Sequence, residues 1–357
     1  MRNISGGSGT GSSKGFPPGD VYNASVRSGV KCVKLQWSDP DNTTIEGGVT
    51  LSTWSSTIIV RKEGSTPTSI KDGDVVLTNT IKNTYSSTPY TDNNVTVGKT
   101  YYYRFYTLST DKVYNDSTSM IYSIKAKEYD PILKNNSWEN IIEASEVGAA
   151  SSLWKVGDEI DLTLSGYYNE TVTLQIWDFN HFDKTDGTGK AGICFGMKNL
   201  MKNDVCLDYD GENVSSSWEE CGYRSNTIPK IINSMPSSLQ NGIKEVNTYA
   251  YGIKNGAGNI KSTDKIFLPS IVEIHGNTDY RDYAIESERS SCSQFPIFTN
   301  NNSRIKKTTD NQNGRWWTRS YATNTSYSYA FYYIYTDGTK YTYNAWREEG
   351  ICFCFNV

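Results

Sequence analysis

The sequence contains, at residues 98–106, the stretch GKTYYYRFY, in which aromatic residues recur at alternate positions. Side chains of a β-strand point alternately to its two faces, so Tyr101, Tyr103 and Phe105 would share one face. A strand with one aromatic face must bury that face against another layer of structure. The stretch therefore predicts one strand of a β-sandwich.

Two runs of the same kind precede this stretch, VKLQW at 33–37 and the more weakly alternating TIIVRK at 57–62. Asp, Gly and Pro punctuate the chain between them, and no helical period competes with the strand pattern. We therefore predict a β-sandwich of about 110 residues over 16–128. Residues 5–15 are nearly all Gly, Ser or Thr, so we expect residues 1–15 to form a flexible leader.

The rest of the chain mixes helix and strand signals. The run WENIIEASEV at 138–147 predicts a short helix, which Asn136 or Ser137 could cap. We expect this helix to lie in a connecting segment, 129–152, that leads to a second domain over 153–357. Because strand-like runs alternate with helical ones in that domain, the expected fold class is mainly β with an α+β C-terminal part.

Composition argues against several classes of function. The chain has 357 residues and a formal net charge of −4, and this mild acidity gives no reason to expect nucleic-acid binding. No run reaches the roughly 18 apolar residues that cross a bilayer, and the N-terminal segment lacks the apolar core of a signal peptide. The 26 Tyr beside only two His favour a recognition protein over an enzyme.

Residues suited to catalysis or metal binding are scarce. The seven cysteines are odd in number, scattered and without a C-x-x-C pair, so we expect reduced, buried thiols. The G-x-S-x-G, H-E-x-x-H, P-loop and G-x-G-x-x-G motifs are absent. His181 and His275 stand far apart in the sequence, and we expect structural roles for both. The sequence therefore predicts no catalytic residue, no metal site and no cofactor.

The first domain resembles a known family. PPGDVYNA at 17–24, followed by KLQW, is similar to the first two strands of fibronectin type III domains. VTVGKTY at 95–101 resembles the tyrosine corner of that family, in which the Tyr hydroxyl holds a loop. VRKEGSTP at 60–67 and KDGD at 71–74 resemble the variant that occurs in phage tail and baseplate proteins. The resemblance covers residues 16–128 and implies a spacer domain.

Short motifs also mark the C-terminal part: WKVGD (154–158), WDFNH (177–181), STDKIFL (262–268), WWTRS (316–320) and GI (350–351). Over about 153–357 the chain resembles an uncharacterised domain family of gut bacteria and their phages. The resemblance implies a C-type-lectin-like fold, in the branch shared with formylglycine-generating enzymes and variable phage receptor-binding proteins. The chain departs from the family pattern near its end, where the family's R-P-A is Cys352, Phe353 and Cys354.

Within the WWTRS motif, Trp316 and Trp317 could stack on sugars, but we expect core packing because they belong to the frame of the family. Arg319 is expected to tie loops together through charge-assisted hydrogen bonds.

The segment from Ser320 to Asn344 has the most informative composition. Of its 25 residues, 18 are Tyr, Thr, Ser or Asn, which are the residues that antibodies use to contact antigens. It resembles the segment that retroelements diversify in phage receptor-binding proteins. We expect Phe331 and Ile334 in the core, although Tyr-rich strands could also simply pack on one another. The candidate ligand-binding residues, which we expect to be exposed, are Tyr321, Asn324, Tyr327, Tyr329, Tyr335, Tyr341, Tyr343 and Asn344.

These observations and resemblances suggest a non-enzymatic receptor-binding protein at the tip of a phage or prophage tail. Its expected partners are a bacterial surface receptor, either protein or glycan, and other tail proteins. A homo-oligomer, such as a trimer, is a further expected assembly. The expected location is the virion tail, assembled in the host cytoplasm. The alternatives are a bacterial surface adhesin, a structural tail or decoration protein, and an oxidase of the formylglycine-generating branch.

Overall fold

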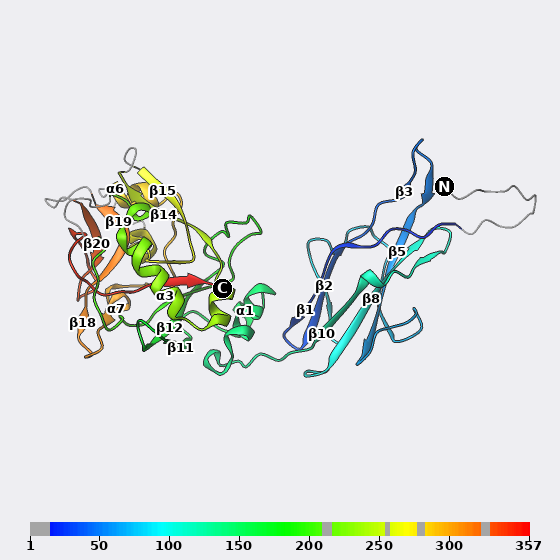
Figure 1. The fold of residues 1–357 in the computed structure, drawn as a ribbon, viewed down its shortest axis with the longest axis horizontal. Coiled ribbons are helices and arrows are strands. Elements are labelled where there is room, and N and C mark those ends of the chain that lie inside the picture. The colour runs from blue at the N-terminus through cyan, green and yellow to red at the C-terminus, as the bar shows by residue number, and fades with distance from the viewer. Residues whose placement is uncertain (1–14, 209–215, 254–257, 277–282, 323–328) are drawn as a thin grey trace, which may run out of the picture. The chain divides into compact units, whose positions relative to one another are not determined.

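The computed structural model describes residues 15–208, 216–253, 258–276, 283–322 and 329–357 (Figure 1). The chain divides into two compact units, Met1–Glu128 and Tyr129–Val357. Antiparallel strand pairs dominate both units, and the α-helices of the described part of the chain are short and lie in the second unit. The expected fold class, mainly β with helices in the C-terminal part, is confirmed. None of the helices in the described ranges is long and apolar enough to span a bilayer.

The first unit is built from two antiparallel sheets. One sheet has the order β1 (Tyr22–Gly29), β2 (Cys32–Ser38), β7 (Tyr90–Asp92). The other has the order β10 (Ile121–Lys125), β8 (Thr100–Ser109), β5 (Trp54–Glu63), β6 (Asp74–Asn79), and β9 (Tyr114–Asn115) pairs with β8. A small hairpin, β3 (Thr43–Thr44) and β4 (Thr50–Ser52), extends the unit.

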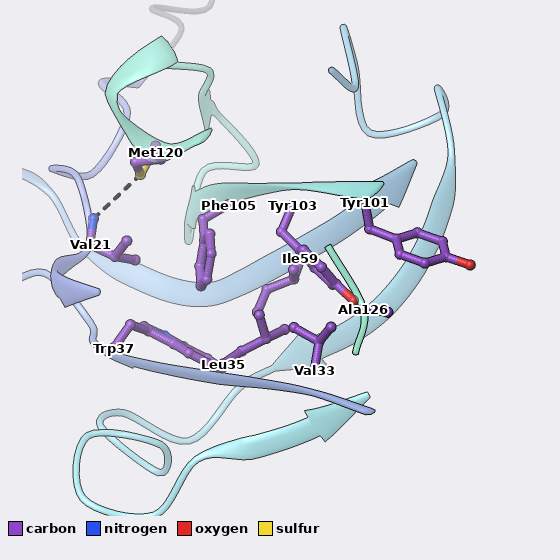
Figure 2. Close-up of a cluster of buried hydrophobic side chains, with 10 residues drawn as sticks. All are labelled: Val21, Val33, Leu35, Trp37, Ile59, Tyr101, Tyr103, Phe105, Met120 and Ala126. Atoms are coloured by element: carbon purple, nitrogen blue, oxygen red, sulfur yellow. Dashed lines mark hydrogen bonds between the residues drawn. The ribbon is translucent and has the colours of Figure 1, made fainter. Parts of the chain in front are cut away.

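The core of this unit lies between the two sheets (Figure 2). Trp37 of β2 packs edge-on against Phe105 of β8, with ring centroids 5.3 Å apart. Tyr101, Tyr103 and Phe105 are all buried in this core, as the alternation of GKTYYYRFY predicts. Because residues from both sheets form one cluster, the predicted sandwich of two sheets is confirmed.

Two tyrosines of β8 also anchor loops through their hydroxyl groups. The backbone N–H of Thr96 donates to the Tyr101 hydroxyl at 2.9 Å, which is the loop contact that the resemblance implied. The Tyr103 hydroxyl donates to Asp92 at 2.8 Å, and Arg61 donates to the same carboxylate at 2.9 Å. Each buried polar tip therefore has a partner, which removes the cost of burying it.

The second unit centres on a five-stranded antiparallel sheet. Its order is β11 (Glu159–Leu164), β12 (Glu170–Phe179), β13 (Ile193–Met197), β22 (Cys354–Asn356), β16 (Ile266–Phe267). Three smaller sheets complete the unit: β14 (Val246–Gly252) with β15 (Gly258–Asp264), β17 (Lys306–Lys307) with β18 (Asn313–Gly314), and β19 (Trp316–Ala322) with β20 (Ala330–Ile334) and β21 (Lys340–Asn344).

Seven short α-helices lie in the described part of this unit: α1 (Trp138–Glu146), α2 (Ala150–Leu153), α3 (Ile228–Ser234), α4 (Ser237–Gly242), α5 (Ile271–His275), α6 (Tyr283–Glu288) and α7 (Asn301–Arg304). The helix predicted over 138–147 is present, and the Ser137 side chain caps it by accepting from the Asn140 backbone N–H. The ring of Trp138 packs edge-on against Phe195 of β13 at 5.5 Å. Helix α1 is thus part of the second unit's core packing.

Strand β19 contains an irregularity that turns one charged side chain into the core. Trp317 pairs with Tyr333 and Tyr321 pairs with Phe331, so four steps along β19 match two steps along β20. Such an interruption of the ladder re-aims the side chains within it. Arg319 lies in this interrupted segment, and its side chain is fully buried.

The Arg319 guanidinium joins several elements at once. It forms a buried ion pair with Glu273 of α5, whose side chain is also fully buried. It also donates to the carbonyl oxygens of Leu268 at 2.6 Å and of Tyr249 at 3.1 Å. Glu273 in turn accepts from the Ser270 backbone N–H at 2.9 Å, which closes the capping box of α5. The expectation that Arg319 ties loops together is confirmed.

Removing this pair should destabilise the second unit. We predict that Arg319→Met lowers the free energy of unfolding by about 3–5 kcal/mol, because it leaves the Glu273 carboxylate buried without a counter-ion. The matched control is Lys198→Met, which breaks the exposed pair with Glu159 and should cost less than about 1 kcal/mol. Urea unfolding followed by tryptophan fluorescence measures both. Equal losses in the two variants would contradict the assigned role of Arg319.

Candidate ligand-binding surface

The sheet β19–β20–β21 gathers the predicted Tyr-rich segment into one aromatic layer. In its register, Tyr333 lies opposite Trp317 on one side and Tyr341 on the other. Phe331 likewise lies between Tyr321 and Tyr343. Residues that pair directly across strands share a face of the sheet. We call the following set, with Tyr335 continuing the alternation beyond β20, the aromatic face: Trp317, Tyr321, Phe331, Tyr333, Tyr335, Tyr341 and Tyr343.

Burial on the aromatic face falls from its centre to its edge. Trp317, Tyr321, Phe331 and Tyr333 are buried, Tyr335 and Tyr343 are half-buried, and Tyr341 is 51% exposed. The Tyr341 ring centroid lies 5.2 Å from that of Tyr335 and 6.2 Å from that of Tyr333. The exposed Tyr341 ring at the edge therefore stands on a packed aromatic base, which limits its rotation.

Two further exposed rings lie where β20 and β21 meet at one end of the sheet. Tyr329 and Trp346 are each 44% exposed, and the Ala345 N–H donates to the Tyr329 carbonyl at 3.1 Å. Tyr329 has φ of 53°, in the left-handed region that non-glycine residues rarely adopt. Trp346 was not among the predicted ligand-binding residues, although a lone Trp directly after the Tyr-rich segment is a sequence signal for such a site.

Arginines flank the aromatic face at both ends. The Arg315 guanidinium lies 4.8 Å from the ring centroid of Tyr335, and that of Arg347 lies 4.5 Å from the centroid of Tyr343. Both reach Glu349, Arg347 through its Nε at 2.6 Å and Arg315 through its Nη1 at 3.6 Å. We call this arrangement the Arg315–Glu349–Arg347 bridge. No sequence signal pointed to it: Arg347 and Glu349 are two residues apart, but only tertiary structure brings Arg315 to the same carboxylate.

Glu349 is held firmly enough to fix the two guanidinium groups. Its side chain is only 6% exposed, and its backbone N–H donates to the Val205 carbonyl at 3.0 Å. Burial raises the pKa of its carboxyl group, although the two arginines oppose this rise. The bridge thus places two cations beside aromatic rings and supplies one shared counter-ion.

The structure distributes the predicted ligand-binding residues unevenly. Tyr329 and Tyr341 are exposed as expected, and Tyr335 and Tyr343 are half-buried. The expected exposure of Tyr321 is wrong, because this residue lies opposite Phe331 at the sheet centre with ring centroids 5.4 Å apart. Asn344 is also buried rather than exposed, since it pairs with Ala330 on the opposite face of the sheet. Asn324 and Tyr327 lie outside the described residues.

The expected core residues of this region are confirmed. Phe331 and Ile334 are fully buried. Trp316 and Trp317 are buried as well, and their indole N–H groups donate to the carbonyl oxygens of Arg304 and Val205, each at 3.1 Å. The tryptophan pair is therefore part of the core and presents no ring to a ligand.

The two histidines considered for catalysis or metal binding lie outside the aromatic face and pack within the protein. His181 Nδ1 lies 2.7 Å from Asp178 Oδ2, and its ring packs on Phe295 at 4.3 Å. Burial lowers the pKa of His275 to about 3, so this imidazole stays neutral. Among the residues that the structure describes, no three His, Cys, Asp or Glu side chains are grouped closely enough to hold a metal ion.

The cysteines are free and buried in the structure, as expected. Cys352 donates to the Met197 carbonyl and Cys354 to the Phe267 carbonyl, so the two thiols have different partners. Burial raises the pKa of Cys352 to about 11 and that of Cys354 well above its usual range. Both are therefore held as thiols, which are poor nucleophiles and poor metal ligands.

Comparison with known proteins adds a domain assignment for part of the chain. Residues 196–357 match the family model described as "Domain of unknown function (DUF6273)". The match includes the aromatic face and the Arg315–Glu349–Arg347 bridge. It begins within β13, so the motifs at 154–158 and 177–181 lie outside it.

The remaining comparisons carry no functional information. The search of curated proteins gives no match. Among solved structures, the chain is similar to the twitchin kinase region from C. elegans, with 11% identity over 52% of this chain and 32% of that chain. The TM-score of 0.21 is too low to support a conclusion about the fold.

The burial of the cysteines predicts slow thiol chemistry. At pH 8, native protein should show less than one fast-reacting thiol with Ellman's reagent, because all seven side chains are shielded. In urea all seven should react. A native thiol that reacts within seconds would contradict the burial and favour a catalytic cysteine, and fewer than seven reactive thiols in urea would reveal a disulfide.

Proposed function

We propose that the chain is a non-enzymatic receptor-binding protein of a phage or prophage tail, which docks its aromatic face on a bacterial surface receptor. The observation that carries this proposal is the exposure of Tyr341 on that face and of Tyr329 and Trp346 beside it, in combination with the Arg315–Glu349–Arg347 bridge. Tyr, Trp and Arg are the residues that dominate binding energy at recognition surfaces. Rings that already rest on a packed base lose little conformational entropy on binding.

The finer fold assignments belong to the same proposal. We take the first unit to be a fibronectin type III domain, supported by its sheet orders β1-β2-β7 and β10-β8-β5-β6 and by the Tyr101–Thr96 contact. We take the second unit to be C-type-lectin-like. Its support is the resemblance of the motifs and a mixed architecture in which the last strand, β22, lies inside the main sheet.

A position on a phage tail would explain how a small binding surface could attach a whole particle to a bacterial cell. Other tail proteins would carry the chain through its first unit, which resembles spacer domains of tail and baseplate proteins. Several copies on one particle, for example a trimer, would raise the effective concentration after the first contact. The proposed location is accordingly the virion tail.

The test is binding of fluorescently labelled protein to a gut bacterial community, sorted for strains that it stains. On such a strain, Tyr341→Ala/Tyr343→Ala should weaken binding by at least about 30-fold, since hot-spot side chains contribute about 2 kcal/mol or more. The matched control is Tyr167→Ala, which removes a 72% exposed tyrosine from the β11–β12 turn and should leave binding unchanged.

Circular dichroism and the unfolding midpoint establish that the variants are folded. A folded double variant that binds like the wild type would contradict the proposal. An equal loss of binding in Tyr167→Ala would also contradict it, because binding would then depend on any exposed aromatic residue and not specifically on the aromatic face.

A further inference from the structure

The outer rings of the aromatic face, the exposed Tyr341 and the half-buried Tyr343, follow one strand instead of forming a round patch. Tyr341 and Tyr343 are two residues apart on β21, and a strand rises by about 3.3 Å per residue, so their side chains leave it about 6.6 Å apart. Tyr335 packs beside Tyr341, and Trp346 and Tyr329 lie beyond the other end of the strand. The rings of Tyr335, Tyr341 and Tyr343 thus form a row along the sheet.

Polar groups with fixed positions accompany this row. Arg315 and Arg347 lie over rings at its two ends, and both are tied to the buried Glu349. A guanidinium has five N–H donors in a rigid plane, so a side chain anchored by one edge keeps donors in a defined direction. Glu349 is thereby a positioning residue for donors at the two ends of the row.

The charges around the row are close to balanced. The two guanidinium groups share the Glu349 carboxylate, and Glu348 beside them is exposed. The whole chain carries a formal charge of −4. This surface therefore does not have the excess of cations that binding to a phosphate-rich or uronic-acid-rich polymer requires.

A folded protein partner would be recognised differently. Protein hot spots gather near the centre of an interface, in well-packed pockets that exclude water. A groove of about 540 Å³ in the described part of the second unit is lined by residues between Pro131 and Glu159 and does not include the aromatic face. A row of rings with fixed donors at its two ends instead suits an extended ligand that offers both apolar faces and hydroxyl groups.

We infer that the aromatic face, together with the neighbouring Trp346, binds a neutral glycan chain of the bacterial surface, with sugar C–H faces on Tyr341 and Trp346 and sugar hydroxyls on Arg315 and Arg347. This inference rests on the proposed function, which leaves the receptor open between protein and glycan. It requires no metal ion, because the contacts are ring stacking and hydrogen bonds from side chains that the structure already holds in place.

The experiment uses a stained strain from the sorting described above and the full chain. Cells are treated with sodium periodate, which cleaves vicinal diols of sugars, or with proteinase K, or mock-treated. Deproteinised polysaccharide extracted from the same strain serves as the competitor. We expect periodate to reduce binding at least tenfold, proteinase K to leave it unchanged, and the polysaccharide to compete. Raising the salt from 0.1 to 0.5 M should change binding less than twofold, because the contacts are not ionic.

The outcomes separate the inference from the proposed function. Binding that survives periodate and is lost after proteinase K would overturn the glycan while leaving a receptor-binding protein. If both treatments abolish binding, competition by the extracted polysaccharide supports the inference and its absence overturns it. A loss of binding in high salt would overturn the inference that the ligand is neutral and would indicate an anionic ligand. The failure to stain any strain before treatment would contradict the proposed function itself.

A variant series tests the positioning role of Glu349. Glu349→Gln keeps the shape of the side chain but removes the charge that anchors both arginines, so we expect polysaccharide competition to weaken at least fivefold. The conservative Glu349→Asp should retain more binding than Glu349→Gln, and Tyr167→Ala should match the wild type. If Glu349→Gln binds like the wild type with an unchanged unfolding midpoint, the fixed arginine donors play no part in recognition and this part of the inference fails.

Discussion

The buried ion pair between Arg319 and Glu273 is the constraint on which the second unit depends. A buried guanidinium is costly unless its donors and charge are satisfied, and this one is satisfied from α5, from β14 and from the chain between them. Those partners must all converge on one point of β19. The pair therefore specifies where β19 lies, and β20 and β21 are built outward from that strand.

The aromatic face follows from this placement. The interrupted ladder between β19 and β20 lets Arg319 turn into the core while Trp317 and Tyr321 stay opposite Tyr333 and Phe331. The inner rings form a rigid base, so the outer ring of Tyr341 is presented without being free to collapse onto the protein. The buried Arg319–Glu273 pair thus contributes to recognition at the surface, because it fixes the strand on which the outer rings are preorganised.

Patterns of period two or of helix capping could be read directly from the sequence, because they depend on neighbouring residues. The alternation in GKTYYYRFY identified Tyr101, Tyr103 and Phe105 as inward-facing, and Ser137 was one of two caps proposed for α1. Composition alone identified the segment from 320 to 344 as unusual. It could not rank the tyrosines by exposure, because Tyr321 is buried through its register with β20, which depends on pairing between strands.

The Arg315–Glu349–Arg347 bridge was beyond prediction for a related reason. Glu349 resembles any surface glutamate in the sequence, and only its pairing with Val205 and the two arginines gives it a role. The most direct test of the account is hydroxyl-radical footprinting of the chain, free and bound to cells of a stained strain, read by mass spectrometry. Docking through the aromatic face should protect Tyr329, Tyr341 and Trp346 severalfold and leave the labelling of Tyr167 unchanged. Unchanged labelling of Tyr341 in bound protein, with protection on another surface, would contradict it.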